Sequence, residues 1–248
     1  MDGQRERFEM LVGAQGLARL KDASVAIFGL GGVGGYVLEA LARSGIGELH
    51  LIDNDRIAAS NLNRQILALH CTVGKTKVEA AAARVREIDP EICVHTYQTF
   101  YLPEVRKQFD FASFDYVVDC IDTVTAKLDL VMQCRAAGTP ILCALGTGNK
   151  LDPAKLTVAD IYETSVCPLA RNMRKELRRR GVEHLKVVYS QEEPLTPRFS
   201  PKQEAAPTEG PEAFGSQRRS IPGSSAFVPA AAGLMLASVV VRDLLGLA

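Results

Sequence analysis

One stretch decides the fold: residues 25–64, VAIFGLGGVGGYVLEALARSGIGELHLIDNDRIAASNLNR. It opens with four apolar residues, which are typical of a buried parallel strand. Gly29, Gly31 and Gly34 follow in G-x-G-x-x-G spacing. In that pattern the first glycine permits a tight turn, the second lets the backbone approach a phosphate, and the third lets a helix pack closely. The pattern indicates a nucleotide-binding turn.

The residues after this turn complete the unit. A helix is predicted over 33–44, ending at the glycine that follows it, and a second apolar strand over 49–52. That strand leads to Asp53, where the ribose hydroxyl of a nucleotide is expected. Strand, turn, helix, strand and acid in this order predict a nucleotide-binding α/β fold.

Charged residues farther along favour ATP over a nicotinamide dinucleotide. Arg64, Lys77 and Asp122 fall where predicted strands of one sheet end. A hydride-transfer site needs no cations around a third phosphate, whereas these residues can hold a triphosphate and its magnesium. An NAD-binding or nucleotide-sensing module without adenylation chemistry remains the alternative from another functional class.

The rest of the chain alternates helices and strands. This alternation predicts an α/β fold with a doubly wound, mainly parallel, Rossmann-like sheet. The further helices are expected over 4–23, 61–69, 77–88 and 125–137, and the further strands over 92–99, 116–121 and 140–144.

We expect a single domain over 1–248. Residues 192–222 hold six of the twelve prolines, with glycines and serines, and are predicted to form a flexible insert. Residues 225–247 are apolar again and are expected to cover the end of the sheet. Their apolar run is short for a bilayer and is interrupted by Pro229 and Gly233, so we expect a buried helix and no membrane partner.

Composition narrows the class of protein. The chain is 47% hydrophobic and 23% charged, with 29 basic and 29 acidic residues, so a nucleic-acid partner requires a local basic patch. Six cysteines occur without a C-x-x-C pair, and a four-cysteine structural zinc is not expected. The amino terminus lacks an apolar signal core, which indicates a cytoplasmic location.

The strongest basic patch is RNMRKELRRRGVEHLK, residues 171–186, with seven Arg or Lys against two Glu. Apolar residues recur every four positions on a different face of the predicted helix. Such a face is either merely solvated or binds a phosphate backbone, and the surplus of cations favours the second. The candidate residues for contact with a nucleic-acid backbone, which the resemblance given below makes that of tRNA, are Arg171, Arg174, Lys175, Arg178 and Arg179.

Several motifs together resemble a known superfamily. GLGGVG, D-x-D followed by S-N-x-N-R-Q, GKTKVE and DCID are similar to motifs of the ubiquitin-activating-enzyme-like adenylyltransferases, the ThiF/MoeB/HesA superfamily. Within it, IDTVTAKL, GTGNKLDP and ADIYETSVCPLARNMRKELRRRG resemble the tRNA threonylcarbamoyladenosine dehydratases. The resemblance implies a homodimer that uses ATP and Mg²⁺ to adenylate the carboxylate of threonylcarbamoyladenosine in tRNA. Cyclisation of that base would then release AMP, after pyrophosphate.

The resemblance also implies residue roles. Catalysis would involve Asp122, Arg64, Lys77 and Arg7, with Asp122 holding Mg²⁺ and Arg7 reaching the neighbouring subunit. Without the resemblance, Arg7 is simply part of a solvated charged face. ATP would contact Gly29, Gly31, Gly32, Asp53, Asp55, Asn61, Arg64, Gln65 and Lys77.

Three questions stay open at this level. The alternative substrate is the carboxyl terminus of a ubiquitin-like sulfur-carrier protein, and a sulfur-relay protein is a possible further partner. Cys167 could act as a nucleophile, although cyclisation within one modified base needs none. The turn over 146–150 either only joins two strands or contacts substrate.

Overall fold

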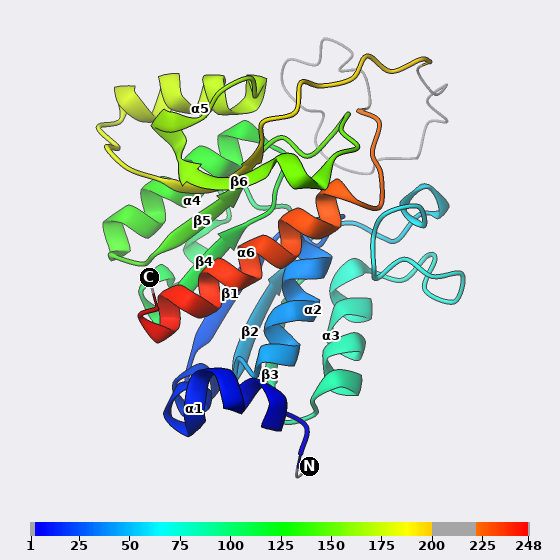
Figure 1. Cartoon of the computed structure of the whole chain (residues 1–248), viewed down its shortest axis with the longest axis vertical. Helices are drawn as coiled ribbons and strands as arrows, with labels where there is room; N and C mark the ends of the chain where they lie inside the picture. The colour runs from blue at the N-terminus through cyan, green and yellow to red at the C-terminus, as the bar shows by residue number, and fades with distance from the viewer. Residues whose placement is uncertain (1–2, 200–221, 248) are drawn as a thin grey trace.

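The computed structural model describes residues 3–199 and 222–247, and these build one seven-stranded sheet (Figure 1). The strand order is β3-β2-β1-β4-β5-β7-β6. The strands are β1 (Ser24–Phe28), β2 (Glu48–Ile52), β3 (Cys93–Tyr97), β4 (Tyr116–Asp119), β5 (Ile141–Ala144), β6 (Leu156–Asp160) and β7 (Lys186–Ser190).

The helices in the described ranges are α1 (Glu6–Lys21), α2 (Gly34–Ser44), α3 (Lys77–Ile88), α4 (Val124–Ala137), α5 (Pro168–Arg179) and α6 (Val228–Leu245). Short 3₁₀ turns lie at η1 (Ala59–Asn61), η2 (Arg106–Gln108), η3 (Phe111–Ser113), η4 (Pro153–Lys155) and η5 (Ile161–Glu163). The sheet is parallel except where β6 pairs with β7, which confirms the predicted mainly parallel α/β fold.

Alternation along the strands explains why helices cover both faces. In β1, Val25 and Ile27 pack with α2, α3 and α6, whereas Ala26 and Phe28 pack with α4 and the segment 101–114. Both sets are fully buried, which is why residues 25–28 of the strand are all apolar. Figure 1 looks onto the face that α2 and α6 cover. The sheet is therefore doubly wound, as predicted.

Three local predictions were wrong. Residues 61–69 do not form a helix: η1 ends at Asn61 and successive turns follow, because asparagine side chains compete for the backbone bonds of a helix. The basic helix α5 ends at Arg179 rather than continuing to 186, since Gly181 has a left-handed φ of 67° and strand β7 follows. The strands β6 and β7 were not foreseen.

The last helix, α6, lies along a face of the sheet beside α2 rather than over its end. A Cβ at Gly233 would lie 2.4 Å from the carbonyl oxygen of Val33, so the two helices touch backbone to backbone. By length and composition α6 could cross a membrane, but half of it is buried inside the fold, as a core helix requires.

We propose that the chain forms one domain, because its first helix, α1, contacts its last helix, α6. Arg19 of α1 donates a hydrogen bond of 3.1 Å to the carbonyl of Leu245 in α6. The predicted insert over 192–222 falls largely on residues 200–221, which lie outside the described residues. Its described ends pack together: Leu195 N–H donates to the Asn149 carbonyl at 2.7 Å, and Gly223 N–H to the Asn149 side chain at 2.6 Å.

Candidate nucleotide site

The turn after β1 is held by two glycines. Gly29 has a φ of 92°, and a Cβ there would lie 2.8 Å from the carbonyl oxygen of Cys120. A Cβ at Gly34 would lie 1.8 Å from the Gly29 oxygen. Side chains at these positions would break the turn, whereas at Gly31 a Cβ would meet only the Gln65 amide nitrogen at 4.0 Å. The backbone at Gly31 is thus open to a ligand, as the spacing predicts.

Arg64 and Gln65 lie over this open backbone. A Cβ at Gly32 would be 3.5 Å from Cγ of Arg64, so the arginine stem covers that glycine. Gln65 is buried, and its Oε1 has no hydrogen-bond partner within the described ranges. A buried, unpaired amide oxygen beside an open glycine backbone fits a polar ligand that supplies the missing bond.

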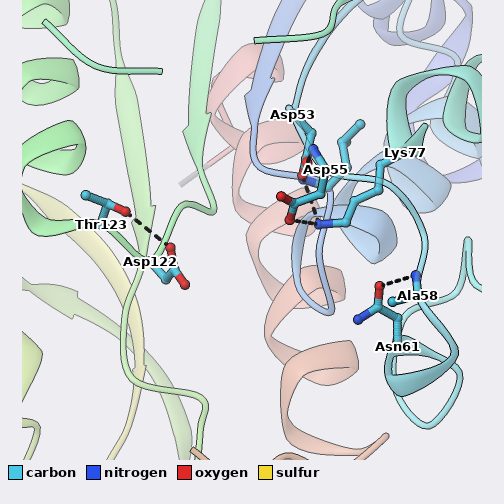
Figure 2. A network of polar contacts seen from close by, with 8 residues as sticks. Asp53, Asp55, Ala58, Asn61, Lys77, Asp122 and Thr123 are labelled. Atoms are coloured by element: carbon cyan, nitrogen blue, oxygen red, sulfur yellow. Dashed lines mark hydrogen bonds and ion pairs between the residues drawn. The ribbon is translucent and has the colours of Figure 1, made fainter. Parts of the chain in front are cut away.

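Asp53 ties the turn to its neighbours. Its Oδ2 accepts from the backbone N–H of Leu30 at 2.7 Å, and its Oδ1 from that of Asp55 at 2.8 Å. Lys77 Nζ lies 3.4 Å from Asp53 and 2.6 Å from Asp55. Figure 2 shows this ammonium between the two carboxylates. The carboxylate expected at the ribose is therefore also the residue that shapes the glycine turn.

The position of Lys77 depends on a capping box. Thr76 caps α3 by accepting from Glu79 N–H at 3.2 Å, and the Glu79 carboxylate accepts from Thr76 N–H at 3.2 Å. The Thr76 hydrogen bond lowers the pKa of Glu79. This places Lys77 as the first helical residue, with 5% of it exposed. Thr76 and Glu79 were missed from sequence, although T-x-x-E before a helix is a capping signal.

Asn61 and Arg64 occupy the η1 segment and the turn after it. The Asn61 Oδ1 accepts from Ala58 N–H at 3.1 Å, which leaves its amide nitrogen to donate (Figure 2). Arg64 Nη1 donates to the carbonyl of Ser60 and the side chain of Asn63, both at 3.0 Å. Burial lowers the pKa of Arg64. The ordinary pKa of a guanidinium is so high that Arg64 stays charged at neutral pH.

Asp122 follows β4 at the same edge of the sheet. It is exposed, and in the described part of the chain its carboxylate accepts a 3.4 Å hydrogen bond from the Thr123 hydroxyl. Figure 2 shows Asp122 with Thr123 on one side of the view and Lys77 and Asn61 on the other. Strand order reverses between β1 and β4, and ligands of open α/β sheets bind at the carboxyl ends of strands at such a point.

Two hollows of about 270 and 430 Å³ open elsewhere on the described surface. The first is lined by residues of α1 and the end of α3, including Arg5 and Asp89, and the second by residues of α4 and α5, including Leu128 and Arg180. Neither includes a predicted nucleotide residue. The candidate nucleotide site is therefore the open glycine backbone with the polar groups around it, and neither hollow is part of it.

Comparison with known proteins decides the family. Residues 4–247 match the model of the ThiF family. The chain belongs to the ThiF family. It is 39% identical over 243 residues to a tRNA threonylcarbamoyladenosine dehydratase of Bacillus subtilis, covering 98% of this chain and 94% of that protein.

A solved structure and a second type of relative complete the comparison. The Escherichia coli tRNA N6-threonylcarbamoyladenosine dehydratase TcdA, in complex with ATP, matches with a TM-score of 0.84 and 31% identity over 99% of this chain and 96% of that chain. The E. coli molybdopterin-synthase adenylyltransferase is 39% identical over 127 residues, 51% of each protein. Similarity to the B. subtilis dehydratase thus spans nearly the whole ThiF-family chain, and similarity to the molybdopterin-synthase adenylyltransferase spans half of it.

Arg7 of this ThiF-family chain lies apart from the other predicted site residues. It is exposed on α1, which begins the chain at the amino ends of the strands. Arg5, two residues earlier, pairs with Asp89 at the end of α3, and Gly47 N–H donates to the Leu20 carbonyl at 3.1 Å. Asp122 and Lys77 lie at the opposite edge, so Arg7 does not join them within one chain.

The basic patch on α5 is only partly free. Arg179 and Arg180 pair with Glu176 at 3.0 and 2.7 Å, and the hydrogen bond from Arg180 lowers the pKa of Glu176. Arg174 donates to the Thr164 carbonyl at 2.8 Å. Arg178 lies 5.0 Å from the ring centre of Tyr162, and Arg171 and Lys175 are exposed.

Cys167 is buried and begins α5. Its sulfur accepts from Ala170 N–H at 3.5 Å, and a Cβ at Gly146 would lie 2.5 Å from the sulfur. The turn 146–150 therefore packs on this cysteine. Lys150 in the same turn is also buried, and donates to the Ser190 carbonyl at 3.0 Å.

Replacing Lys77 tests the nucleotide site. We expect Lys77→Met to weaken ATP affinity by about 10- to 100-fold, because a charge-assisted hydrogen bond contributes roughly 1.5–3 kcal/mol. Isothermal titration with ATP and Mg²⁺ measures the change, and circular dichroism checks folding. Lys75→Met, an exposed lysine two residues away, is the matched control and should bind normally. Equal affinity of both variants would remove Lys77 from the site.

Proposed function

We propose that this protein is an ATP-dependent tRNA threonylcarbamoyladenosine dehydratase. It activates the side-chain carboxylate of the modified adenosine by adenylation, with release of pyrophosphate, and closes a ring with release of AMP. The observation that carries the proposal is similarity to a dehydratase over nearly the full length of both chains. The cations and the acid at the carboxyl edge support it, since the same residue types suit a triphosphate and its metal.

The donor groups fit ATP and magnesium. Asp53 would hold the ribose, the Gly31–Gly32 backbone and Asn61 would donate to phosphates, and Asp122 would hold Mg²⁺. When bound, ATP with Mg²⁺ supplies an electrophilic phosphorus and a good leaving group. The ring closure gains from a high effective concentration, so the proposal needs no protein nucleophile and leaves Cys167 a structural residue.

The main task of the protein in this reaction is electrostatic. A carboxylate and a triphosphate repel each other, and the reaction brings them into contact. Arg64 and Lys77 are fixed by their neighbours before any ligand arrives, so they offset the repulsion without reorganising. Their charges are the groups we expect to stabilise the transition state.

The rival function is adenylation of a ubiquitin-like sulfur carrier, supported by the similarity to molybdopterin-synthase adenylyltransferase over half the chain. The two functions share the ATP site and differ in substrate. Incubation with ATP, Mg²⁺ and either tRNA bearing threonylcarbamoyladenosine or a carrier protein separates them. AMP release with the tRNA alone supports the dehydratase, and release with the carrier alone supports the rival.

Removing Asp122 tests the catalytic assignment. We expect Asp122→Ala to lower AMP formation with modified tRNA by at least about 100-fold, because a charged group at the reacting phosphate is lost. The fold should persist, since the side chain is exposed and has one long hydrogen bond in the described region. Glu104→Ala, also exposed, is the control. Full activity of Asp122→Ala would exclude its catalytic role.

We further propose a homodimer in which Arg7 serves the nucleotide site of the partner subunit. Arg7 is far from the site of its own chain, as its place on α1 requires. Met10 and Leu11, on the same helix, are 85% and 80% exposed, which is typical of an apolar contact surface. The kink at Gly13, with φ 72° and ψ 166°, divides α1, and before it Phe8 and Val12 pack on the core while Met10 and Leu11 face outward.

Mixed dimers test the action of Arg7 in trans. Arg7→Ala and Asp122→Ala should each be inactive alone. Co-expressed, they should recover up to roughly a quarter of normal activity, because half of randomly formed dimers are mixed and each mixed dimer has one intact site. Differently tagged subunits confirm the mixing. No recovery in verified mixed dimers would show that Arg7 acts elsewhere.

We propose that α5 binds the tRNA backbone. The sequence predicts five candidate cations: Arg171, Arg174, Lys175, Arg178 and Arg179. The contacts that each makes within the chain indicate which of them are available to bind phosphates. Arg171, Lys175 and Arg178 carry the proposal, since Arg174 is engaged with Thr164 and Arg179 with Glu176. The stacking of Arg178 on Tyr162 orients its guanidinium without neutralising it.

Salt dependence tests this surface. Replacing Arg171, Lys175 and Arg178 by Ala should weaken tRNA binding and reduce the slope of log affinity against log salt by about three, one per lost phosphate contact. Filter binding at several salt concentrations measures the slope. Replacing Lys21, Arg86 and Lys107, which are exposed cations off α5, removes the same charge and should change the slope little. Equal slopes for both triple variants would contradict the proposal.

We also propose a cytoplasmic location. The six cysteines, all in the described residues, are free, as in a reducing compartment. Cell fractionation tests the location, and co-purification tests whether a sulfur-relay protein accompanies the enzyme.

A further inference from the structure

The amino edge of the sheet carries a second group of chemically active side chains. Glu48 and His50 belong to β2, and Cys93 and His95 to β3. In each strand one apolar residue, Leu49 or Val94, separates the two members of the pair. Because side chains alternate along a strand, both members point to the same face of the sheet. The parallel register sets Glu48 opposite Cys93 and His50 opposite His95. Four potential metal ligands therefore form a two-by-two array on neighbouring strands.

The ligand atoms of Glu48, Cys93 and His95 are close enough to share one ion, and His50 adjoins them through Glu48. His95 Nε2 lies 2.7 Å from Glu48 Oε1 and 3.3 Å from Cys93 Sγ, and the three atoms lie within 4.8 Å of one another. His50 Nε2 is 3.3 Å from the same Glu48 oxygen. In a tetrahedral zinc site, bonds of 2.0–2.3 Å place ligand atoms about 3.3–3.6 Å apart. Opening the array by about half an ångström would accommodate the ion.

His50 is prepared for ligation by its surroundings. Its Nδ1 lies 3.3 Å from the Tyr97 hydroxyl, and when Nδ1 donates that bond, the Nε2 lone pair faces Glu48. The ring stacks on His95 at 4.5 Å and meets Phe114 edge-on at 4.8 Å, which fixes its orientation.

We propose that Glu48, His50, Cys93 and His95 form a binding site for a zinc-like divalent cation. A thiolate with two imidazoles selects zinc over magnesium and calcium, which prefer oxygen ligands. The side chains of His95 and Glu48 are 42% and 39% exposed, which provides a path for the ion, and that of His50 is 10% exposed, which provides a rigid anchor. The site is unlike the four-cysteine zinc site that the cysteine spacing argues against.

The site is independent of the proposed reaction. It lies at the first residues of β2, whereas Asp53 follows the last, about 13 Å away along the strand. A bound ion would cross-link β2 to the edge strand β3 by side chains in addition to their backbone hydrogen bonds. We therefore expect it to stabilise the fold and to leave nucleotide binding unchanged.

Zinc titration of the full chain tests the proposal. With a reductant that does not chelate metals, competition against a chromophoric chelator should give one tight Zn²⁺ site, which Mg²⁺ does not fill. Cys93→Ser and His95→Gln should each weaken it by at least about tenfold, the loss seen even for outer-shell partners. Both positions are exposed or half-exposed, so these variants should fold. Their thermal unfolding without metal checks this.

The matched control is His70→Gln with Cys71→Ser, an adjacent exposed histidine and cysteine away from the array. It should keep the site. Co²⁺ in place of zinc should give the visible absorption of a tetrahedral thiolate complex in the wild type and not in Cys93→Ser. Absence of a tight site in the wild type, or equal zinc affinity in wild type and Cys93→Ser, would overturn the proposal whatever the enzyme's activity.

Discussion

The arrangement of the loops at the carboxyl edge of this sheet depends on one carboxylate, that of Asp53. The glycine turn after β1 has few side chains to hold it, yet it must keep its backbone open. Asp53 holds it from the end of β2 by accepting from the N–H of Leu30, and it accepts from Asp55 as well. Because the same carboxylate also contacts Lys77, the turn, the end of β2 and the start of α3 form one rigid unit. A ligand at this edge meets groups that are already in position.

A second buried pair supports the neighbouring strands. Lys127 of α4 and Asp119 of β4 are fully buried 3.0 Å apart, and Lys127 also donates to the Ala144 carbonyl of β5 at 2.8 Å. Burial disfavours the ammonium, but the charge of Asp119, the nearby Cys143 and the hydrogen bond to Asp119 together outweigh burial and raise the pKa of Lys127. A buried pair contributes little net stability, while loss of one partner is costly. It therefore fixes how α4 sits beneath the exposed Asp122.

The two edges of the sheet have separate chemistry because parallel strands sort their ends. The glycine turn, Asp53 and Asp122 follow the carboxyl ends of β1, β2 and β4, whereas the Glu48–His95 array lies toward the amino ends of β2 and β3. This sorting leaves Arg7 remote from the candidate site of its own chain, which is why we propose that it serves the site of a partner. It also lets a metal brace one edge without disturbing the other.

Sequence alone determined the features that local chemistry encodes. The apolar runs, the glycine spacing and the helix over 77–88 follow from short-range sterics and periodicity, and the similarity to the family agrees with them. Sequence reasoning missed β6 and β7 and extended α5 too far, because short strands and the end of a basic helix depend on what packs against them. The sequence also showed a surplus of cations in α5, but not that Glu176 and Thr164 bind some of them.

Only the tertiary structure decided the contacts between residues far apart in the chain. Gln65 lies over Gly31, Lys77 lies between two carboxylates, and a cysteine and histidine of β3 lie beside a glutamate and histidine of β2. The physical reason is that these contacts depend on how distant segments pack. For the β2–β3 group it is register, since a one-residue shift between the strands would turn its side chains to the other face.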